Sequence, residues 1–218
     1  MFLMARSGNK LGAVAEELRG CGASRVDTMV LDALDYDNHD RLVTLASERL
    51  GSIDVALIAH GTLADQKACE SSFEETRREL EINALSVVSL LTRLGNYFEE
   101  RKKGTLVVFS SVAGDRGRQS NYVYGTAKAA VNVFLQGLRN RLHRSGVTVI
   151  TLKIGRVDTP MTSGFKKSWS WAQPDRVARG ICRAIDRSIE VAYVPWYWRV
   201  IMLVIRAIPE KVFKRLRM

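Results

Sequence analysis

Residues 105–128 read TLVVFSSVAGDRGRQSNYVYGTAK, and this stretch decides the fold. It opens with a run of apolar and β-branched residues at 105–110, which predicts a buried strand. A polar loop that contains glycine follows at 114–120, and a helical pattern runs from Tyr122 to His143. A continuous apolar strand followed by a loop and a helix is typical of a parallel sheet that helices cover on both faces.

The same alternation extends in both directions from this stretch. Strands are predicted at 2–5, 25–31, 55–59, 147–154 and 191–194, and helices at 10–19, 39–50, 73–100 and 173–188. This order predicts an α/β protein with a doubly wound parallel sheet over residues 1–194, and a basic amphipathic C-terminal tail over 195–218. Such sheets bind ligands beyond the carboxyl ends of their strands, so a site is expected at that edge.

The composition excludes several classes of protein. The chain has 218 residues, 46% hydrophobic and 26% charged, which suits one globular domain with its own core. Cys21, Cys69 and Cys182 are far apart in the sequence, so we expect a reducing compartment and neither a disulfide framework nor a cysteine zinc site. The three histidines share no metal-ligand spacing, and no metal is predicted. No apolar run reaches the roughly 18 residues that span a bilayer.

Tyr124 and Lys128 carry the first chemical signal. Their i,i+4 spacing puts a phenol and an ammonium on one helix face. A nearby ammonium favours tyrosinate and lowers the tyrosine pKa from about 10. Tyr124 is then a candidate proton donor to a carbonyl, or acceptor from an alcohol. A solvated helix face is the alternative for such a pair.

Two further polar residues point to the same edge. Ser111 follows the strand at 105–110 and lies 13 residues before Tyr124. Its hydroxyl is a candidate partner of the same carbonyl oxygen, and the alternative is a serine that caps local backbone. Asn83 lies inside the helix predicted at 73–100, where asparagine is a mediocre helix former. It is either a solvated or packed residue, or a polar group placed against Lys128.

Taken together, Ser111-Val-Ala-Gly114, Tyr124-x-x-x-Lys128 and the upstream Asn83 resemble the short-chain dehydrogenase/reductase family, over residues 2 to about 194. The resemblance implies a Rossmann-type fold and an NAD(P)-dependent oxidoreductase. It implies that Tyr124 is the general acid/base, that Lys128 holds the nicotinamide ribose and lowers the Tyr124 pKa, and that Ser111 orients the substrate carbonyl. Asn83 would anchor a proton-relay water. Helices 73–100 and 122–143 would form the dimer interface common in the family, so a homo-oligomer is expected.

The resemblance also implies where the dinucleotide binds. Asp32 and Ala33 follow the strand after which the family typically has an aspartate at the adenine ring; a turn aspartate is the alternative. Ala59-His60-Gly61 stands where the family commonly has Asn-Ala-Gly, and His60 is expected to be packed or solvated rather than catalytic. Residues 154–159, IGRVDT, resemble the family's Pro-Gly-x-Val-x-Thr segment, in which Val157 would offer backbone to the carboxamide. The implied cofactor-binding residues are Arg6, Asp32, Ala33, Ala59, Gly61, Tyr124, Lys128, Val157 and Thr159.

Arg6 bears on the choice between the two dinucleotides. An NAD enzyme usually places an acid after this strand, against the ribose 2′-hydroxyl. Here Ala5 is followed by Arg6 and Ser7. Because a guanidinium suits a 2′-phosphate, NADP(H) is favoured over NAD(H). The alternative for Arg6 is a surface arginine.

One part of the family pattern is not found. The family begins with a strand and a Gly-rich turn that seats the pyrophosphate on a helix N-terminus. Gly8 and Gly12 follow what looks like the family's second strand, so they are not that turn. We therefore expect one strand–helix unit, roughly 30 residues, to be missing before Met1, with a groove in the core in its place. A misassigned start, a fragment, or a shortened chain that no longer binds a dinucleotide are the alternatives.

The net charge of +10 is uneven, because residues 199–218 carry six basic residues and one acidic residue. They are also apolar, and Trp196 and Trp198 flank Tyr197 just before them. Aromatic, apolar and basic residues together are typical of an interfacial helix, which predicts an anionic membrane surface as a partner. Nucleic acid is not expected, because nucleic-acid binders more often spread basic charge over the folded body. Packing of the tail on the domain or on a second subunit is the alternative.

Within the family, four segments look similar to the decaprenylphosphoryl-2-keto-ribose reductases, which reduce a keto group on a lipid-linked pentose. They are residues 31–35, the loop with Arg116 and Arg118, residues 155–157, and the ending IPEKVFKRL at 208–216. The leading interpretation is an NADPH-dependent ketoreductase for a polyprenyl-phosphate-linked sugar, cytoplasmic and peripheral on the inner face of the membrane, with Arg116 and Arg118 near the phosphate. Two alternatives stay open: a soluble carbonyl or 3-oxoacyl reductase, and a non-catalytic scaffold or regulatory protein that has lost the dinucleotide loop.

Overall fold

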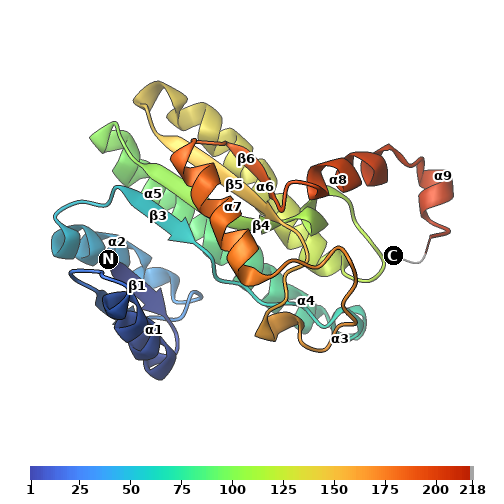
Figure 1. The fold of residues 1–218 in the computed structure, drawn as a ribbon, viewed down its shortest axis with the longest axis horizontal. Helices are drawn as coiled ribbons and strands as arrows, with labels where there is room; N and C mark the ends of the chain where they lie inside the picture. Colours follow the sequence, from blue (N-terminus) through green and yellow to red (C-terminus); the bar gives the residue numbers. More distant parts are fainter. Residues whose placement is uncertain (217–218) are drawn as a thin grey trace.

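Residues 1–216, which this computed structural model describes, alternate between parallel strands and helices (Figure 1). The strands are β1 (Phe2–Ala5), β2 (Asp27–Val30), β3 (Val55–Ile58), β4 (Thr105–Ser111), β5 (Thr148–Ile154) and β6 (Val191–Val194). The α-helices are α1 (Gly8–Gly20), α2 (His39–Leu50), α3 (Gln66–Ser71), α4 (Phe73–Leu80), α5 (Ser86–Arg101), α6 (Tyr122–Leu142), α7 (Pro174–Asp186), α8 (Trp198–Ala207) and α9 (Glu210–Phe213). Arg217, one of the basic residues counted in the tail, lies outside the described residues.

Short helical turns complete the described chain. Four are of the 3₁₀ type, namely η1 (Tyr36–Asn38), η3 (Val112–Asp115), η4 (His143–Ser145) and η5 (Pro160–Thr162). A fifth, η2 (Glu81–Leu85), is a π-helical turn. It joins α4 to α5, so the helix predicted at 73–100 is interrupted in its middle.

The predicted α/β fold with a parallel sheet is confirmed. α2 covers the predicted residues 39–50, and β6 the predicted residues 191–194. The sequence does not predict α3, because six residues are too few to show a helical period. The carboxylate of Asp65 begins this helix by accepting hydrogen bonds from the N–H groups of Lys67 and Ala68.

The described strands form two separate parallel sheets. One pairs β1 with β2, and the other has the order β3-β4-β5-β6. No ladder joins β1 to β3. On β3 the apolar side chains of Val55 and Leu57 are 49% and 52% exposed, although the remaining strands of this sheet are largely buried. The break lies where the family resemblance places a further strand, and where the sequence predicts a groove.

Helices cover both faces of the four-stranded sheet, with α7 on one face and α5 and α6 on the other (Figure 1). Successive residues of β4 and β5 point to opposite faces, and both strands place apolar residues on both faces. The face under α5 and α6 is built from Leu106, Val108 and Val149 with Leu91, Phe98 and Leu135. The face under α7 is built from Val107, Ile150 and Leu152 with Val177 and Ala184.

The C-terminal tail begins directly after β6 and packs on the domain by one face of α8. Trp198 is 4% exposed and Met202 is fully buried, in a cluster with Val112 of η3. The Trp198 indole lies on Gly155, where a Cβ atom would come within 1.9 Å of the indole Nε1. The sequence left packing on the domain as an alternative for the tail. The face of α8 that carries Trp198 and Met202 does pack in this way. No helix among residues 1–216 is long and apolar enough to cross a membrane.

Candidate active site

The predicted catalytic residues meet where β4 ends and α6 begins. Ser111 is the last residue of β4, and Tyr124 and Lys128 lie in the first two turns of α6. Two glycines allow η3, the turn after β4, to lie directly on α6. A Cβ atom at Gly114 would come within 2.7 Å of the carbonyl carbon of Lys128, and one at Gly125 within 2.9 Å of a carbonyl oxygen in η3. Glycine at both positions therefore brings the strand end to the helix start.

A buried polar pair that the sequence analysis did not identify fixes the same junction. Ser110 Oγ donates a hydrogen bond to Asn132 Oδ1 at 2.6 Å, and Asn132 Nδ2 donates to the Gly114 carbonyl at 3.4 Å. Both side chains are buried, so removing one of them would leave the other buried without a hydrogen-bond partner. Asn132 lies one helical turn beyond Lys128, and this spacing is the signal that could have identified it.

The hydroxyl of Ser111 has two local hydrogen bonds. It accepts one from the N–H of Ala113 at 3.1 Å and donates one to the Ile154 carbonyl of β5 at 3.3 Å. The local capping that the sequence left as an alternative is therefore present. The Ser111 side chain also acts on Tyr124, since its hydrogen bonding lowers the pKa of that phenol.

Burial nevertheless raises the net pKa of Tyr124 above its usual value of 10. The carboxylate of Glu79 raises this pKa further, because it disfavours a second negative charge. The net direction is opposite to the one predicted from Lys128. The Lys128 Nζ atom lies 5.6 Å from the centroid of the phenol ring, and burial lowers the pKa of Lys128 itself to about 8. Tyr124 therefore carries its proton at neutral pH.

Asn83 lies in the π-helical turn η2 and is fully buried. Its Oδ1 accepts a hydrogen bond from the N–H of Thr62 at 3.0 Å, and its Nδ2 donates to Thr62 Oγ1 and to Glu79 Oε2. A Cβ atom at Gly61 would lie 2.7 Å from Asn83 Oδ1 and 3.6 Å from Lys128 Nζ, so both side chains face this glycine. The structure thus brings Asn83, Gly61 and Lys128 together. Thr62 and Glu79 were not identified from the sequence, because their partners are 4 to 21 residues away.

His60 is packed and neutral. Its Nε2 lies 2.8 Å from Ser86 Oγ. Because Ser86 Oγ donates its own proton to the Ile82 carbonyl at 2.6 Å, the imidazole must be the donor to Ser86. Burial, followed by the charges of Lys128 and His39, lowers the pKa of His60 to about 4, while Asp32 raises it. Asp32 follows β2 and His60 follows β3. The carboxylate of Asp32 is therefore near enough to His60 to affect its pKa.

The remaining cofactor-binding candidates follow the strand ends in two groups. Arg6 follows β1 and is exposed, and Asp32 and Ala33 follow β2. Asp32 accepts a hydrogen bond from the N–H of Leu34 at 2.9 Å, so it is a turn aspartate with one carboxylate oxygen engaged. Ala59 follows β3 and is exposed.

Val157 and Thr159 follow β5. Thr162 Oγ1 donates a hydrogen bond to the Val157 carbonyl at 2.7 Å, and it also accepts one from the N–H of Thr159. Val157 additionally pairs with Ala172 in an isolated parallel bridge. These bonds fix the conformation of the segment after β5. The end of β5 is itself joined to the end of β4 by the hydrogen bond from Ser111 to Ile154.

The surroundings of Lys128 fit the nicotinamide–ribose half of a dinucleotide. An ammonium has three hydrogens to donate. Its one hydrogen bond to a described residue goes to the Phe109 carbonyl at 3.3 Å. Gly61 faces the same ammonium, because a Cβ atom there would lie 3.6 Å from Lys128 Nζ. This fit concerns the nicotinamide–ribose end of the dinucleotide.

The two loop arginines have different surroundings. The prediction that Arg116 lies near a substrate phosphate is not supported, because its guanidinium binds the tail. It donates hydrogen bonds to the carbonyls of Ile205 and Ile208 at 2.7 and 2.6 Å, and it forms an ion pair with Glu210. The Arg118 guanidinium instead has a buried Nε without a partner among the described residues. Burial, and then the charge of Arg156, lower the pKa of Arg118.

A profile of the family described as short chain dehydrogenase matches residues 1–169. An uncharacterized oxidoreductase of Mycobacterium tuberculosis is 37% identical over 216 residues, which cover 99% of this chain and 87% of that relative. A solved short chain dehydrogenase from Mycobacterium smegmatis superposes with a TM-score of 0.66 at 24% identity, over 71% of this chain and 65% of the other.

A gluconate 5-dehydrogenase from Burkholderia cenocepacia, solved in complex with NADP and tartrate, superposes with a TM-score of 0.80 at 16% identity, over 91% of this chain and 85% of the other. At these identities, the two solved structures establish the shared fold.

Proposed function

The chain belongs to the short-chain dehydrogenase family of oxidoreductases, and we propose that it is an NADPH-dependent ketoreductase. Tyr124 donates a proton to the carbonyl oxygen, Ser111 holds that oxygen by a hydrogen bond, and Lys128 binds the nicotinamide ribose. The observation that carries the proposal is that Ser111, at the carboxyl end of β4, meets Tyr124 and Lys128 in the first two turns of α6. The raised pKa of Tyr124 keeps its phenol protonated. Ketone reduction requires a proton donor at the oxygen. NADPH, when bound, supplies the hydride for the carbonyl carbon.

Arg6 supports the choice of NADPH over NADH. It is exposed directly after β1, and no carboxylate among the described residues forms an ion pair with it. A free guanidinium there is available to a 2′-phosphate. Asp32 and Ala33 hold the adenine end in this proposal, and Ala59, Gly61, Val157 and Thr159 line the nicotinamide end.

Asn83 has a positioning role in the proposal. Its amide is held by Thr62 and Glu79, and it faces Gly61 together with Lys128. We assign it to a water that returns a proton to Tyr124 after each turnover. Glu79 favours this direction of transfer, because its charge keeps the Tyr124 phenol protonated.

We propose as substrate a keto group on a polyprenyl-phosphate-linked sugar. The resemblance of residues 31–35, 155–157 and 208–216 to reductases of such substrates supports it. So do Arg118 and Arg156, which follow β4 and β5 and form no ion pair with a carboxylate among the described residues. Two neighbouring guanidinium groups without an acid favour an anion such as a phosphate diester. Arg116 is not part of this group, because the tail engages it.

The test is NADPH oxidation by the full chain with the Tyr124→Phe and Tyr122→Phe variants. Tyr124→Phe removes the proton donor, and general acid catalysis is worth about 10²–10⁴-fold, so kcat should fall by at least about 100-fold. Tyr122 lies on the same helix and is 43% exposed, so Tyr122→Phe should keep the wild-type kcat. A Tyr124→Phe enzyme with unchanged kcat would contradict the assigned role.

Substrate and cofactor are separated in the same assay. A short polyprenyl-phosphate-linked 2-keto pentose and an acetoacetyl thioester are compared, each with NADPH and with NADH. The proposal expects a higher kcat/KM for the lipid-linked sugar and for NADPH. A preference for the thioester would favour the soluble 3-oxoacyl reductase instead. If the chain binds NADPH but reduces neither compound, the substrate class is wrong, and if it does not bind NADPH, the ketoreductase is wrong and a scaffold role is favoured.

A further inference from the structure

α8 is apolar on two opposite faces, and only one of them is packed. Trp198 and Met202 face the domain and are buried. Val200, Leu203 and Val204 on the other face are 54%, 69% and 59% exposed. A helix on the surface of a globular protein ordinarily turns polar residues to solvent. Three large apolar side chains at i, i+3 and i+4 therefore indicate a surface that binds something apolar.

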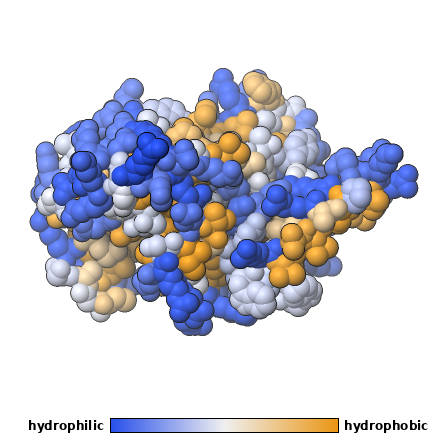
Figure 2. Space-filling model, turned by 90° about the horizontal axis from the view of Figure 1, so that it is seen from above, coloured by the Kyte–Doolittle hydropathy of each residue, from blue (hydrophilic) through white to orange (hydrophobic). Residues whose placement is uncertain are grey.

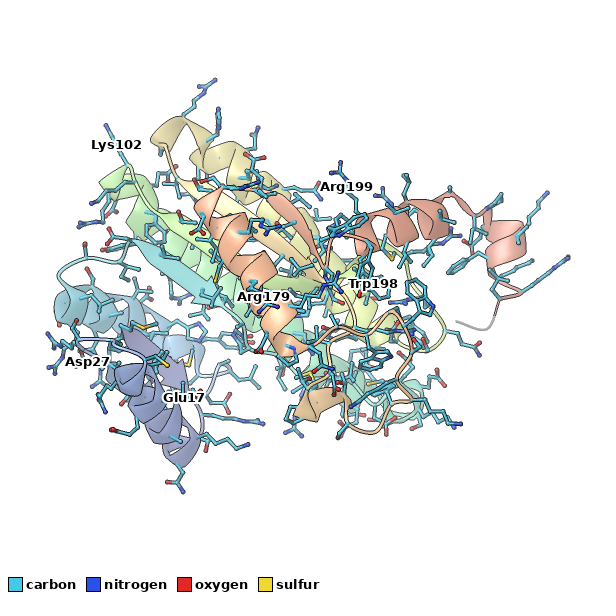
Figure 3. The ribbon with its side chains drawn as sticks, in the orientation of Figure 1. Glu17, Asp27, Lys102, Arg179, Trp198 and Arg199 are labelled. Carbon is cyan, nitrogen blue, oxygen red and sulfur yellow. The ribbon has the colours of Figure 1, made fainter. Side chains whose placement is uncertain are left out.

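Aromatic side chains extend this surface. Trp196 is 71% exposed and Trp169, from the segment between β5 and α7, is 82% exposed. Both rings lie next to Tyr197, with centroid distances of 6.4 and 6.3 Å. We call Trp169, Trp196, Val200, Leu203 and Val204 together the tail face. Figure 3 places Trp198, the buried anchor, where the tail joins the rest of the chain.

The tail that carries most of this face is rich in exposed basic side chains and poor in acidic ones. Exposed basic residues of the tail are Arg199, Arg206, Lys211, Lys214 and Arg215. The one acidic residue between 195 and 216 is Glu210, and Arg116 neutralises it. In Figure 2 the projecting C-terminal segment carries hydrophobic residues bordered by hydrophilic ones.

From this combination we infer that the tail face docks on the surface of an anionic lipid bilayer. The helix spans 10 residues, about 15 Å at 1.5 Å per residue, so it lies in the plane of the interface and does not cross it. Its apolar residues enter the headgroup–acyl boundary, tryptophan is favoured at that depth, and the basic residues meet anionic headgroups. A second copy of the chain is a poorer partner, because a two-fold contact would bring the same basic residues together.

The docked helix would lie at the rim of the candidate active site. Its buried face contacts Val112 and Gly155, which are the neighbours of Ser111 and Ile154 in the sequence. Ser111 and Ile154 are in turn joined by a hydrogen bond. Ser111 lies at one edge of the sheet, and docking would bring this edge close to the lipid. The inference does not depend on the reductase activity, because binding to vesicles is measured without cofactor or substrate.

The experiment is co-sedimentation of the full chain with phosphatidylcholine vesicles, with and without phosphatidylglycerol. Wild type should bind the vesicles with phosphatidylglycerol and be released by high salt. Leu203→Gln/Val204→Gln removes apolar area that is exposed, so the fold should be kept, which circular dichroism checks. Its partition onto anionic vesicles should fall by about tenfold or more. Val133→Gln is the matched control, because Val133 is 67% exposed on α6, and it should bind like wild type.

A second arm tests the charge. Arg199→Gln/Lys211→Gln should weaken binding to the anionic vesicles about thirtyfold, because the two basic residues contribute roughly 1 kcal/mol each near such a surface. The inference is overturned if wild type stays in the supernatant, or if Leu203→Gln/Val204→Gln sediments like wild type. It is also overturned if the wild type does not sediment with vesicles and forms a dimer that the Leu203→Gln/Val204→Gln substitutions abolish. The tail face would then bind a second copy of the chain.

Discussion

The imidazole of His60 is neutral because its surroundings disfavour a positive charge. Burial contributes most, and the nearby Lys128 and His39 contribute further. The Nε2–H group is already engaged by Ser86, whose hydroxyl donates to Ile82 in η2. His60 therefore ties the segment after β3 to the π-helical turn that holds Asn83. Its role in the structure is to position this turn.

We expect His60 to make the fold sensitive to mild acid. Its pKa is about 4 in the folded protein and about 6.5 when unfolded. The unfolded state therefore binds the proton first, and the free energy of unfolding falls as pH drops from 6.5 to 4. His60→Asn should remove about 2 kcal/mol of this fall, measured by urea unfolding at pH 7 and pH 4.5. His143→Asn, at an exposed position, should keep the wild-type profile, and a His60→Asn profile parallel to wild type would contradict the account.

Individual residues of the site differ in how far the sequence predicts them. Tyr124, Lys128 and Ser111 are found because their spacing along one strand–loop–helix unit is short. The sequence does not predict the direction in which the Tyr124 pKa shifts. Burial and the charge of Glu79 raise this pKa, and both depend on the whole fold. Arg116 is assigned to the substrate from its loop position, but its partners lie about 90 residues later in α8 and beyond. No local pattern predicts such a contact.

At the scale of elements, the contact between η3 and α6 determines the geometry of the site. Gly114 is its closest point, since a Cβ there would lie 2.7 Å from both Asn132 Nδ2 and the carbonyl carbon of Lys128. The backbone of Lys128 lies within a helix, so it cannot move aside as a flexible side chain can. A larger residue would push η3, and with it Ser111, away from Tyr124.

Gly114→Ala should therefore destabilise the protein by about 1–3 kcal/mol and also lower kcat. Gly137→Ala is the matched control on α6, because nothing lies within 4 Å of a Cβ at that position. Alanine is the better helix former, so the control should be more stable by about 0.5–1 kcal/mol. Both effects are measured by urea unfolding. Equal stability of the two variants would show that η3 does not pack on α6 as described.

The elements themselves are largely predictable because each carries a local signal. α2 begins and ends where the periodic pattern does, and β4 and β5 are rich in apolar and β-branched residues. The π-helical turn at 81–85 is not predictable from the sequence period, because it is a single turn of five residues and is too short to show a period of its own. Asn83 as a poor helix former was the one local hint.

At the scale of the whole molecule, the tail and the sheet are joined through buried polar groups. Asp115 of η3 forms an ion pair with Lys153 of β5 and accepts a hydrogen bond from the Tyr193 hydroxyl of β6 at 2.6 Å. The neighbouring Arg116 binds the last carbonyls of α8. Two successive residues of one turn thus connect three strand ends with the tail. The sequence predicts the strands and the tail, but not these ties, because they join segments 38 to 92 residues apart.

Removing the carboxylate of Asp115 tests whether these ties hold the molecule together. Its side chain is 3% exposed and that of Lys153 13%, so Asp115→Asn leaves a buried ammonium without its counter-charge. Breaking one partner of a buried pair costs about 3–5 kcal/mol, and the free energy of unfolding should fall by that amount. Asp54→Asn is the control, because its ion pair with Lys103 is exposed on both sides and contributes at most about 1 kcal/mol. If Asp115→Asn unfolds at the same urea concentration as Asp54→Asn, the buried pair between Asp115 and Lys153 does not stabilise this part of the fold.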